Sequence, residues 1–386
     1  MTSPAKVDGR VLIDASNLRV GGGVQVAVSF LDELALMLED PSLTCRLPWA
    51  AHVSVEVSRA VWKQLAVPTR VRLDPEIAER TWKHVLRSGN GDRDFDVSFV
   101  VFGPEYAPRR ARCRIVGFAD VTALYARPEG VPTPPTPLRM KRQVRGWVSR
   151  WLTRRADVVV VETTEMARRI DSVLGFDSAS VHVVPNTVNG VFDAPARWHP
   201  LPMRVRRTKT EFLVTTVSRG YPHKNLEFLG RLMGELRQRG HEVTSVVTLR
   251  DDEWEMLAPE VRRFMRNVGE LEVQELPALY AECDAAAFPS LLEAFSAMPL
   301  EAMKSRRPLF ASDRPFVRAV CGDAPIYFDP LDLAAAADTF ADAIDNKAEL
   351  SRSVARGSEI QATLPSAEDR ALSYLRIIDS SIVGRR

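Results

Sequence analysis

Two glutamates, Glu293 and Glu301, lie eight positions apart in the stretch Pro289–Glu301, which reads PSLLEAFSAMPLE. On one continuous α-helix they would be about 12 Å apart and face different directions. The stretch follows an apolar run, and Pro299 suits a first helical turn, so the residues predict a strand, a loop and a helix start. Unpaired N–H groups at such a start bind anions, and the two carboxylates could hold sugar or ribose hydroxyls beside them. The alternative is an ordinary loop and helix with solvated acids.

Two cations, Arg219 and Lys224, lie five positions apart in the run Ser218–Asn225. An apolar strand precedes this run and a helical pattern, 225–239, follows it, so both cations are expected on one loop. Cations on one loop can converge on a diphosphate. Surface cations are the alternative, but positive charge opposes the dipole at a helix start, which favours a binding role.

A third candidate is the run Gly21–Gly23, between an expected strand at Val11–Asp14 and an expected helix at Val24–Leu38. Glycines in such a loop let the backbone approach a ligand closely. The run lacks the third glycine of the dinucleotide-binding fingerprint. A simple tight turn is the alternative.

Composition narrows the class of protein. The chain has 386 residues, of which 45% are hydrophobic and 26% charged, which predicts a globular protein of two domains. A net charge of +2 gives no case for nucleic acid. The four cysteines form no CxxC pair and the six histidines show no metal-ligand spacing, so we expect no metal site and a reducing cytoplasm. No signal peptide or membrane-spanning run is visible.

The apolar runs alternate with helical patterns, which predicts an α/β fold with doubly wound parallel sheets. In the first half, strands are expected at Val11–Asp14, Val53–Val57, Val71–Leu73, Val97–Phe102, Arg114–Phe118, Val158–Val161 and Val181–Val184. A polar stretch at 193–210 is the expected linker. The second half restarts with strands at Phe212–Val217, Val243–Leu249 and Ala285–Phe288, and with helices that include Glu253–Asn267. Ligands bind such sheets beyond the carboxyl ends of the strands.

A basic amphipathic helix is expected at 138–155. Residues 101–170 hold fourteen Arg or Lys and six acids, a local balance of +8. Within this region Met140, Val144, Trp147, Val148, Trp151 and Leu152 recur at helical spacing among seven basic residues. Such a helix can lie on an anionic membrane surface, here the inner face. The alternative, which we favour for the apolar stripe, is that it packs on the sheet while the arginines face water.

Taken together, these motifs resemble the retaining GT-B glycosyltransferases of family 4. The resemblance rests on Ser218-Arg219 with Lys224-Asn225, on Asn267–Glu270 leading to Leu279-Tyr280, on Phe288–Met303, and in the first half on Gly21–Gly23, Ala156–Thr164 and Val183–Val188. It implies two Rossmann-like domains facing a central cleft: an acceptor-binding domain at 1–192, a linker at 193–210, a nucleotide-sugar domain at 211–362, and a C-terminal helix at 363–386 returning to the first domain.

The resemblance also implies roles for individual residues. Arg219 and Lys224 would hold the donor's diphosphate, Glu301 the ribose, and Glu293 would face the donor sugar. The substrate-binding positions that it implies are Gly22, Gly23, Asn186, Val268, Ala294, Phe295, Ser296, Ala297, Met298 and Glu301, and the catalytic positions are Arg219, Lys224, Glu293 and Asp120. No metal is implied.

Two departures from the family pattern concern the sugar. The usual Glu-Gly-Phe-Gly is here Glu293-Ala294-Phe295-Ser296, so side chains stand where glycines normally let the donor approach. The loop that usually offers a histidine to the donor sugar reads Gly117-Phe118-Ala119-Asp120, so Asp120 is expected to take over that contact. The alternative is a sugar that lacks the polar partner, which suggests a 6-deoxy donor such as fucose or rhamnose.

The expected function is transfer of a hexose or 6-deoxyhexose, with retained configuration, from a GDP- or UDP-sugar to a glycan or lipid-linked acceptor in surface polysaccharide biosynthesis. No cofactor is expected beyond the nucleotide-sugar substrate. The protein is expected in the cytoplasm, at the inner face of the membrane if the basic helix binds lipid. The alternatives are a nucleotide-sugar epimerase of the same fold and a catalytically silent nucleotide-sugar-binding protein, which the changes at Ala294 and Ser296 keep open.

Overall fold

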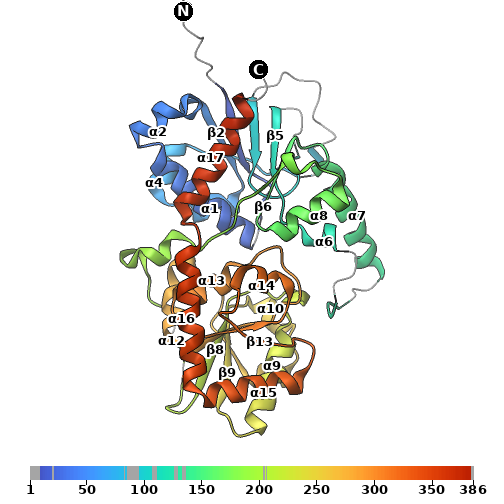
Figure 1. Cartoon of the computed structure of the whole chain (residues 1–386), viewed down its shortest axis with the longest axis vertical. Coiled ribbons are helices and arrows are strands. Elements are labelled where there is room, and N and C mark those ends of the chain that lie inside the picture. The colour runs from blue at the N-terminus through green and yellow to red at the C-terminus, as the bar shows by residue number, and fades with distance from the viewer. Residues whose placement is uncertain are drawn as a thin grey trace, which may run out of the picture. The chain divides into compact units, whose positions relative to one another are not determined.

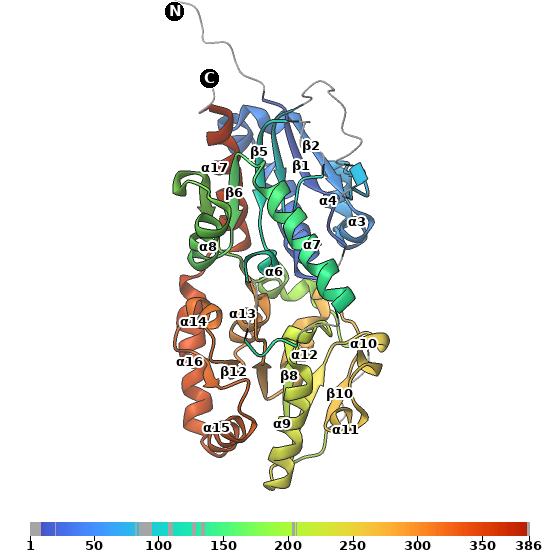
Figure 2. The same ribbon diagram turned by 90° about the vertical axis from the view of Figure 1, so that its right-hand side faces the viewer.

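A computed structural model describes residues 9–19, 21–81, 83–84, 95–106, 111–125, 129–132, 136–202, 205 and 207–383 of the chain. The chain divides into two compact units. Unit 1 comprises residues 1–126, 135–186 and 365–386, and unit 2 comprises residues 127–134 and 187–364. Each unit holds a parallel β-sheet with helices on its faces (Figures 1 and 2).

The described part of unit 1 is built around a seven-stranded sheet in the order β3-β2-β1-β4-β5-β6-β7. Its strands are β1 (Val11–Ala15), β2 (Val53–Val57), β3 (Glu76–Ile77), β4 (Phe95–Val100), β5 (Ala111–Gly117), β6 (Val158–Val161) and β7 (Val181–Val183). Its helices are α1 (Gly22–Met37), α2 (Pro41–Arg46), η1 (Pro48–His52), α3 (Arg59–Gln64), α4 (Val67–Leu73), α6 (Val121–Leu124), α7 (Thr136–Thr153), α8 (Thr164–Leu174), η2 (Ser178–Ser180) and α17 (Ala367–Val383). The central strands β1, β4 and β5 are buried over most of their length because helices cover both faces of a parallel sheet.

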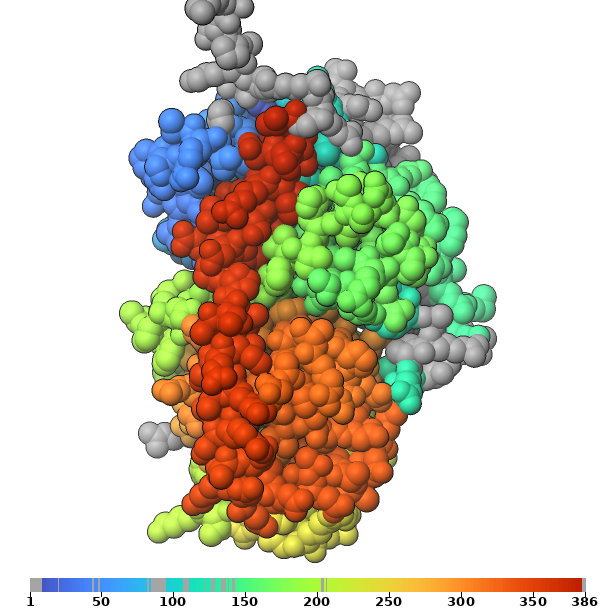
Figure 3. Space-filling model, in the orientation of Figure 1, coloured from blue at the N-terminus to red at the C-terminus, as the bar shows by residue number. Residues whose placement is uncertain are grey.

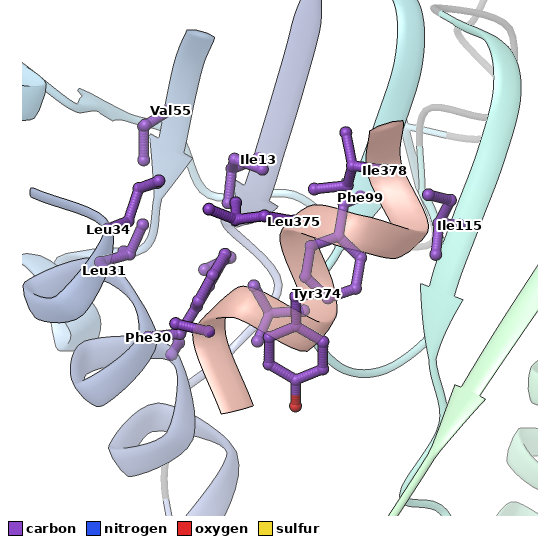
Figure 4. Packing of buried hydrophobic residues seen from close by; sticks show 14 of the residues in the cluster. Ile13, Phe30, Leu31, Leu34, Val55, Phe99, Ile115, Tyr374, Leu375 and Ile378 are labelled. Atoms are coloured by element: carbon purple, nitrogen blue, oxygen red, sulfur yellow. The ribbon is translucent and has the colours of Figure 1, made fainter. Parts of the chain in front are cut away.

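The core of unit 1 lies between the sheet and helices α1 and α17. Phe30 of α1, Phe99 of β4 and Tyr374 of α17 pack with ring centroids 5.1–5.8 Å apart (Figure 4). The C-terminal helix α17 therefore completes the core of unit 1, whose other elements come from the N-terminal half of the chain. Figure 3 shows its outer face (red) at the surface of unit 1, between the blue N-terminal segments and green α8.

The described part of unit 2 is built around a six-stranded sheet in the order β10-β9-β8-β11-β12-β13. Its strands are β8 (Phe212–Thr216), β9 (Val243–Val247), β10 (Met265–Asn267), β11 (Ala285–Phe288), β12 (Leu309–Ser312) and β13 (Ile326–Phe328). Its helices are η3 (Gly190–Asp193), η4 (Pro195–Arg197), η5 (Pro222–Lys224), α9 (Leu226–Gln238), α10 (Asp251–Glu255), α11 (Pro259–Arg262), η6 (Val273–Glu275), α12 (Leu276–Glu282), α13 (Ala297–Lys304), α14 (Pro315–Cys321), α15 (Leu333–Asp345) and α16 (Lys347–Thr363). Helices α9 and α15 cover one face, and α12 and α13 the other.

The stretch expected as a linker, 193–210, belongs to unit 2, and its residues 203, 204 and 206 lie outside the described residues. The Trp198 indole donates a hydrogen bond to the Val191 carbonyl oxygen at 2.8 Å. Arg207 forms an ion pair with Asp284 at 3.1 Å. These contacts hold the described part of the stretch against unit 2.

Two expected elements are wrong. The expected strand Val71–Leu73 is the end of helix α4, which begins beside Pro68 and leaves Val71 exposed. The expected helix Glu253–Asn267 is α10, α11 and strand β10 in succession. Pro259 causes this break, because the residue before a proline is held in extended conformation, as Ala258 is.

The glycine run and the basic helix also differ from expectation. Helix α1 already begins at Gly22, so Gly22 and Gly23 lie in its first turn, and Gly21 before it has a φ of 74°, which favours glycine. We predicted that the apolar stripe of α7 packs on the sheet, and this prediction is wrong for most of the stripe. Leu152 is buried, but Met140, Val144, Trp147 and Trp151 are exposed.

Candidate functional site

The stretch with the two glutamates has the expected break. Strand β11 ends at Phe288, the loop carries Glu293, and α13 begins at Ala297 and carries Glu301. The side chain of Ser296, the N-cap residue, accepts no capping hydrogen bond, so the first N–H groups of α13 have no side-chain cap. Such a helix start is suited to an anion. Ala294 is buried, and Phe295 to Met298 lead from the loop into the helix.

The loop after β8 lies against the loop after β11. The Leu291 amide donates a hydrogen bond to the His223 carbonyl oxygen at 2.8 Å. Strands β8 and β11 are neighbours and parallel, so both loops leave the same edge of the sheet. The structure thus brings the cation-bearing loop and the glutamate-bearing loop together, a proximity that no spacing in the sequence could show.

Lys224 and Glu293 form an ion pair at the junction of these loops. The Lys224 Nζ lies 2.5 Å from the Glu293 Oε1, and the side chains are 13% and 11% exposed. The Lys224 ammonium also lies 5.9 Å from the centroid of the Phe288 ring. The expected diphosphate cation and the expected sugar carboxylate are therefore direct partners.

Arg219 lies on the same loop and is held by two carboxylates. Its Nε is 3.0 Å from the Glu253 Oε1, and its Nη1 is 2.5 Å from the Glu270 Oε1. Glu253 is nearly buried, whereas the side chain of Glu270 is 59% exposed. Sequence reasoning did not assign a role to either acid. Glu253 could have been found from the sequence, because it lies in the acidic start of α10 that follows strand β9. Ligands bind at this carboxyl edge of the sheet.

Gly220 follows Arg219 and lies against Glu253. A Cβ atom at Gly220 would stand 2.8 Å from the Glu253 Cβ, closer than side-chain carbons pack. Glycine at this position therefore lets Glu253 approach the loop and reach the Arg219 guanidinium.

Glu301 lies inside unit 2 rather than at its surface. The Tyr280 hydroxyl of α12 donates a hydrogen bond to the Glu301 Oε2 at 3.1 Å. Burial raises the pKa of Glu301 to about 7, and the bond from Tyr280 opposes this rise. Burial raises the pKa of Tyr280 as well, and the neighbouring Glu301 adds to that effect. Glu301 is thus an acid whose charge changes near neutral pH.

Val268, the position expected near the base, follows β10 at the same edge of the sheet. Its amide bonds to the Val247 carbonyl oxygen at 2.9 Å. The side chain of Asn267 accepts a hydrogen bond from the Leu249 amide and donates one to the Leu249 carbonyl oxygen, each at 2.9 Å. These bonds tie the loops after β9 and β10 together beside the Arg219 partners.

A further cation at this edge escaped sequence reasoning because strand β12 was not expected. Arg314 follows β12, and its Nη1 lies 2.8 Å from the Glu129 Oε2. Glu129 belongs to the short segment of the first half that is part of unit 2. Within the described chain, the Nε and Nη2 of Arg314 are buried without a hydrogen-bond partner.

The remaining expected residues lie in unit 1. Gly22 is open, since a Cβ there would meet no atom of the described structure within 4 Å. A Cβ at Gly23 would lie 3.2 Å from the Leu18 side chain. Asp120 lies between β5 and α6, beyond the carboxyl end of β5. Gly22, Gly23 and Asp120 thus share the carboxyl edge of the unit 1 sheet.

Asn186 takes part in a buried polar cluster of unit 1. Arg370 of α17 donates hydrogen bonds to the Asn186 Oδ1 and, at 2.7 Å, to the Ser29 Oγ of α1. The Arg370 side chain is fully buried. Asn186 therefore helps to hold the C-terminal helix in the core of unit 1.

Within the described residues, no three His, Cys, Asp or Glu side chains are grouped so that they could hold a metal ion. None of the helices in the described parts of the chain combines the length and the apolar character that crossing a bilayer requires.

Solved structures match this arrangement over nearly the whole chain. A sucrose-phosphate synthase from Thermosynechococcus elongatus aligns with a TM-score of 0.68 at 14% identity, over 97% of this chain and 100% of that chain. The Anabaena protein HepE in complex with UDP and glucose aligns with a TM-score of 0.65 at 13% identity, over 96% and 100%. The protein has the GT-B fold. The expectation of two Rossmann-like sheets is confirmed.

One family model matches part of the second half of the chain. Residues 211–346 match the family model of the glycosyl transferases group 1. Glycogen synthases from two strains of Mycobacterium tuberculosis, CDC 1551 / Oshkosh and H37Rv, are each 28% identical over 179 residues, which is 45% of this chain. The matched part spans 41% of the length of each relative.

Proposed function

We propose that the protein is a retaining glycosyltransferase that uses a nucleotide-diphospho-sugar. The observation that carries this proposal is the pair of adjoining loops in unit 2. They carry Arg219, Lys224 and Glu293, and the loop with Glu293 leads into the uncapped start of α13. The family model that matches residues 211–346 covers this site, which supports the assignment of the reaction.

In the proposed reaction the bond between the anomeric carbon and the diphosphate oxygen breaks, and the acceptor oxygen bonds to that carbon on the same face. The proton of the acceptor hydroxyl passes to the leaving phosphate oxygen, so atoms and charge balance without a metal. Arg219 and Lys224 would stabilise the charge that grows on the diphosphate. Glu293 would face the positive charge that develops at the sugar ring.

The ion pairs of Arg219 and Lys224 bear on how the donor binds. Arg219 and Lys224 carry two positive charges, while their partners Glu253, Glu270 and Glu293 are three carboxylates. The carboxylates compete with an incoming diphosphate for these two cations. Glu270 is the most exposed of the three, so we propose that it yields its place beside Arg219 to the donor.

The roles of the other site residues are proposed from the family resemblance. We propose that Glu301 binds the ribose, that Val268 borders the base, and that the segment from Ala294 to Met298 contacts the phosphates and the sugar. On the acceptor side we propose Gly22 and Gly23, with Asp120 at the donor sugar. Asn186 would act through the buried Arg370 cluster that holds α17. The transferred group would be a hexose or, as the sequence suggests, a 6-deoxyhexose.

The donor, the acceptor and the place of the reaction in the cell are proposed only as classes. HepE was solved with UDP and with UDP-glucose, which supports UDP-sugars as the first donors to test, with GDP-sugars second. The acceptor would be a glycan or a lipid-linked sugar of a surface polysaccharide. The reaction would then take place in the cytoplasm, at the inner face of the membrane for a lipid-linked acceptor.

The test is a thermal-shift screen of the full chain with nucleoside diphosphates and their sugars, followed by transfer assays. A ligand at a hundred times its dissociation constant adds roughly 2.7 kcal/mol to stability. Arg219→Ala and Lys224→Ala should each remove most of this shift. Arg239→Ala is the matched control, because Arg239 also pairs with two carboxylates but lies at the far end of α9.

An intact shift in both Arg219→Ala and Lys224→Ala would refute the diphosphate assignment. Interconversion of the donor sugar with no acceptor present would instead identify an epimerase. Binding without turnover across a broad acceptor panel would identify a silent binding protein, with Ala294 and Ser296 as the first positions to replace by glycine.

A further inference from the structure

Helix α7 presents an apolar stripe to solvent. The stripe consists of Met140, Val144, Trp147 and Trp151, with exposed fractions of 61%, 61%, 59% and 39%. Figure 2 shows α7 in the foreground of unit 1. Large apolar side chains are scattered singly on most surfaces, whereas a contiguous exposed set marks an interaction site.

The four residues share one side of the helix. At about 100° per residue, they fall within an arc of about 60°, and they extend over about 16 Å of the helix axis. The buried residues Gly146, Ser149 and Leu152 lie on the opposite side. The helix therefore packs on unit 1 through Gly146, Ser149 and Leu152 and directs the four side chains of the stripe away from the core.

Contacts at the C-terminal end hold this orientation. Arg150 donates a hydrogen bond to the Ala123 carbonyl oxygen at 3.1 Å, and Arg154 donates one to the Leu174 carbonyl oxygen at 3.3 Å. The rings of Trp147 and Trp151 stack with centroids 6.4 Å apart and planes at 12°. The stripe is thus an ordered surface on an anchored helix.

The charge around the stripe has a single sign. Residues 136–155 contain seven Arg or Lys and no Asp or Glu. Arg139 and Arg145 are exposed, and the helical period places them on either side of the stripe, about 110° and 130° from its centre. An apolar stripe between two rows of cations, with tryptophans on it, matches the boundary between anionic headgroups and acyl chains.

We propose that this stripe and its flanking cations bind the surface of an anionic lipid bilayer. The apolar side chains enter the headgroup boundary, and the cations remain at the level of the lipid phosphates. Two copies of the chain would not satisfy this surface, because a symmetric contact would bring seven cations against seven without an acid. The proposal rests on unit 1 alone and stands whether or not the proposed reaction is correct.

The first test is sedimentation of the full chain with vesicles of phosphatidylcholine, with and without about a quarter phosphatidylglycerol. We expect binding to the anionic vesicles and weakening by added salt. Val144→Ser/Trp147→Ser should bind at least about tenfold more weakly, because each large apolar side chain gains over 1 kcal/mol on burial. The matched control is Val67→Ser/Val71→Ser, which changes two exposed apolar residues of α4 in the same unit. It should bind like the unmodified protein.

The second test removes charge. Each cation near an anionic membrane contributes about 1 kcal/mol, or about fivefold in affinity, so Arg139→Gln/Arg145→Gln should bind about twenty-five-fold more weakly. The control Arg168→Gln/Arg376→Gln removes two exposed cations from α8 and α17 and should have a much smaller effect. Equal losses for the two pairs would mean that net charge alone drives binding and would overturn the docking surface.

A third measurement guards against misfolded variants. Trp147→Phe/Trp151→Phe keeps the stripe apolar and should keep vesicle binding, but it should lose most quenching of tryptophan fluorescence by brominated lipids. Equal binding to neutral and anionic vesicles, unchanged quenching, concentration-dependent dimers abolished by the stripe variant, or preferential binding of an oligonucleotide would each overturn the proposal.

Discussion

The ion pair between Lys224 and Glu293 can be tested by replacing each partner and then both. Both side chains are at least 87% buried, and the atoms lie 2.5 Å apart. Lys224→Met leaves a carboxylate in a site with little access to water. Breaking such a pair from one side costs about 3 to 5 kcal/mol, whereas replacing both charges by uncharged groups can be nearly neutral. The single variant should therefore be less stable than the double variant Lys224→Met/Glu293→Gln.

The assay is thermal unfolding of the full chain by calorimetry, with the transition of unit 2 analysed by a double-mutant cycle. For a unit of this size, 1 kcal/mol shifts the midpoint by about 2 to 4 °C, so Lys224→Met should unfold roughly 6 to 20 °C earlier. The double variant should recover more than half of this loss. Both variants should lose the thermal shift by a nucleoside diphosphate, because the cation is absent from each.

One result would refute this reasoning. If the double variant is as unstable as the sum of the two single variants, the coupling energy is zero and the two charges do not stabilise each other. The cycle also separates stability from binding. Recovery of stability with continued loss of the ligand shift assigns Lys224 a role toward the diphosphate beyond its pairing with Glu293.

Three further predictions concern the same unit. The raised pKa of Glu301, about 7, means that the folded state binds more protons than the unfolded state between about pH 4.5 and 7, so the folded state loses stability as pH rises through this window. In urea titrations, the free energy of unfolding of Glu301→Gln should rise relative to that of the unmodified protein as the pH goes from 5 to 7.5. A difference that stays constant over this range would contradict the raised pKa of Glu301. Glu270→Gln should tighten nucleoside diphosphate binding up to about fivefold in calorimetric titrations, because an exposed pair with Arg219 is worth at most about 1 kcal/mol; weaker binding would exclude Glu270 as a competitor. Gly220→Ala should destabilise the protein by about 1 to 3 kcal/mol through the clash with Glu253, and an unchanged melting temperature would show that the loop yields.

Local signals in the sequence predicted the elements with long, consistent patterns. Apolar runs of four residues such as Ala285–Phe288 became buried strands, and the break between Glu293 and Glu301 followed from prolines and a change of period. Short runs were ambiguous, because three residues such as Val71–Leu73 fit a helix as well as a strand. Strand β12 was not predicted, so Arg314 at its end was not recognised as a cation at the site edge.

The pairing of charges could not be predicted in the same way. Lys224 and Glu293 are 69 positions apart, and Arg219 meets Glu253 and Glu270 through loops from three different strands. Parallel pairing of β8 with β9 and β11 brings these loops to one edge, and strand order is a property of the whole sheet. The apolar stripe of α7 is a second case, because periodicity shows that a face exists but not what covers it.

The sequence by itself determined the α/β class, the placement of the two cations and Glu293 on loops beyond strands, and the concentration of positive charge around 138–155. These follow from local period, turn residues and composition, which act over a few neighbours along the chain. Tertiary structure alone decided that Lys224 faces Glu293, that two carboxylates hold Arg219, that Glu301 is buried against Tyr280, and that the tryptophans of α7 face water. Each of these depends on burial and on contacts between distant segments, which the packing of the sheets and helices sets.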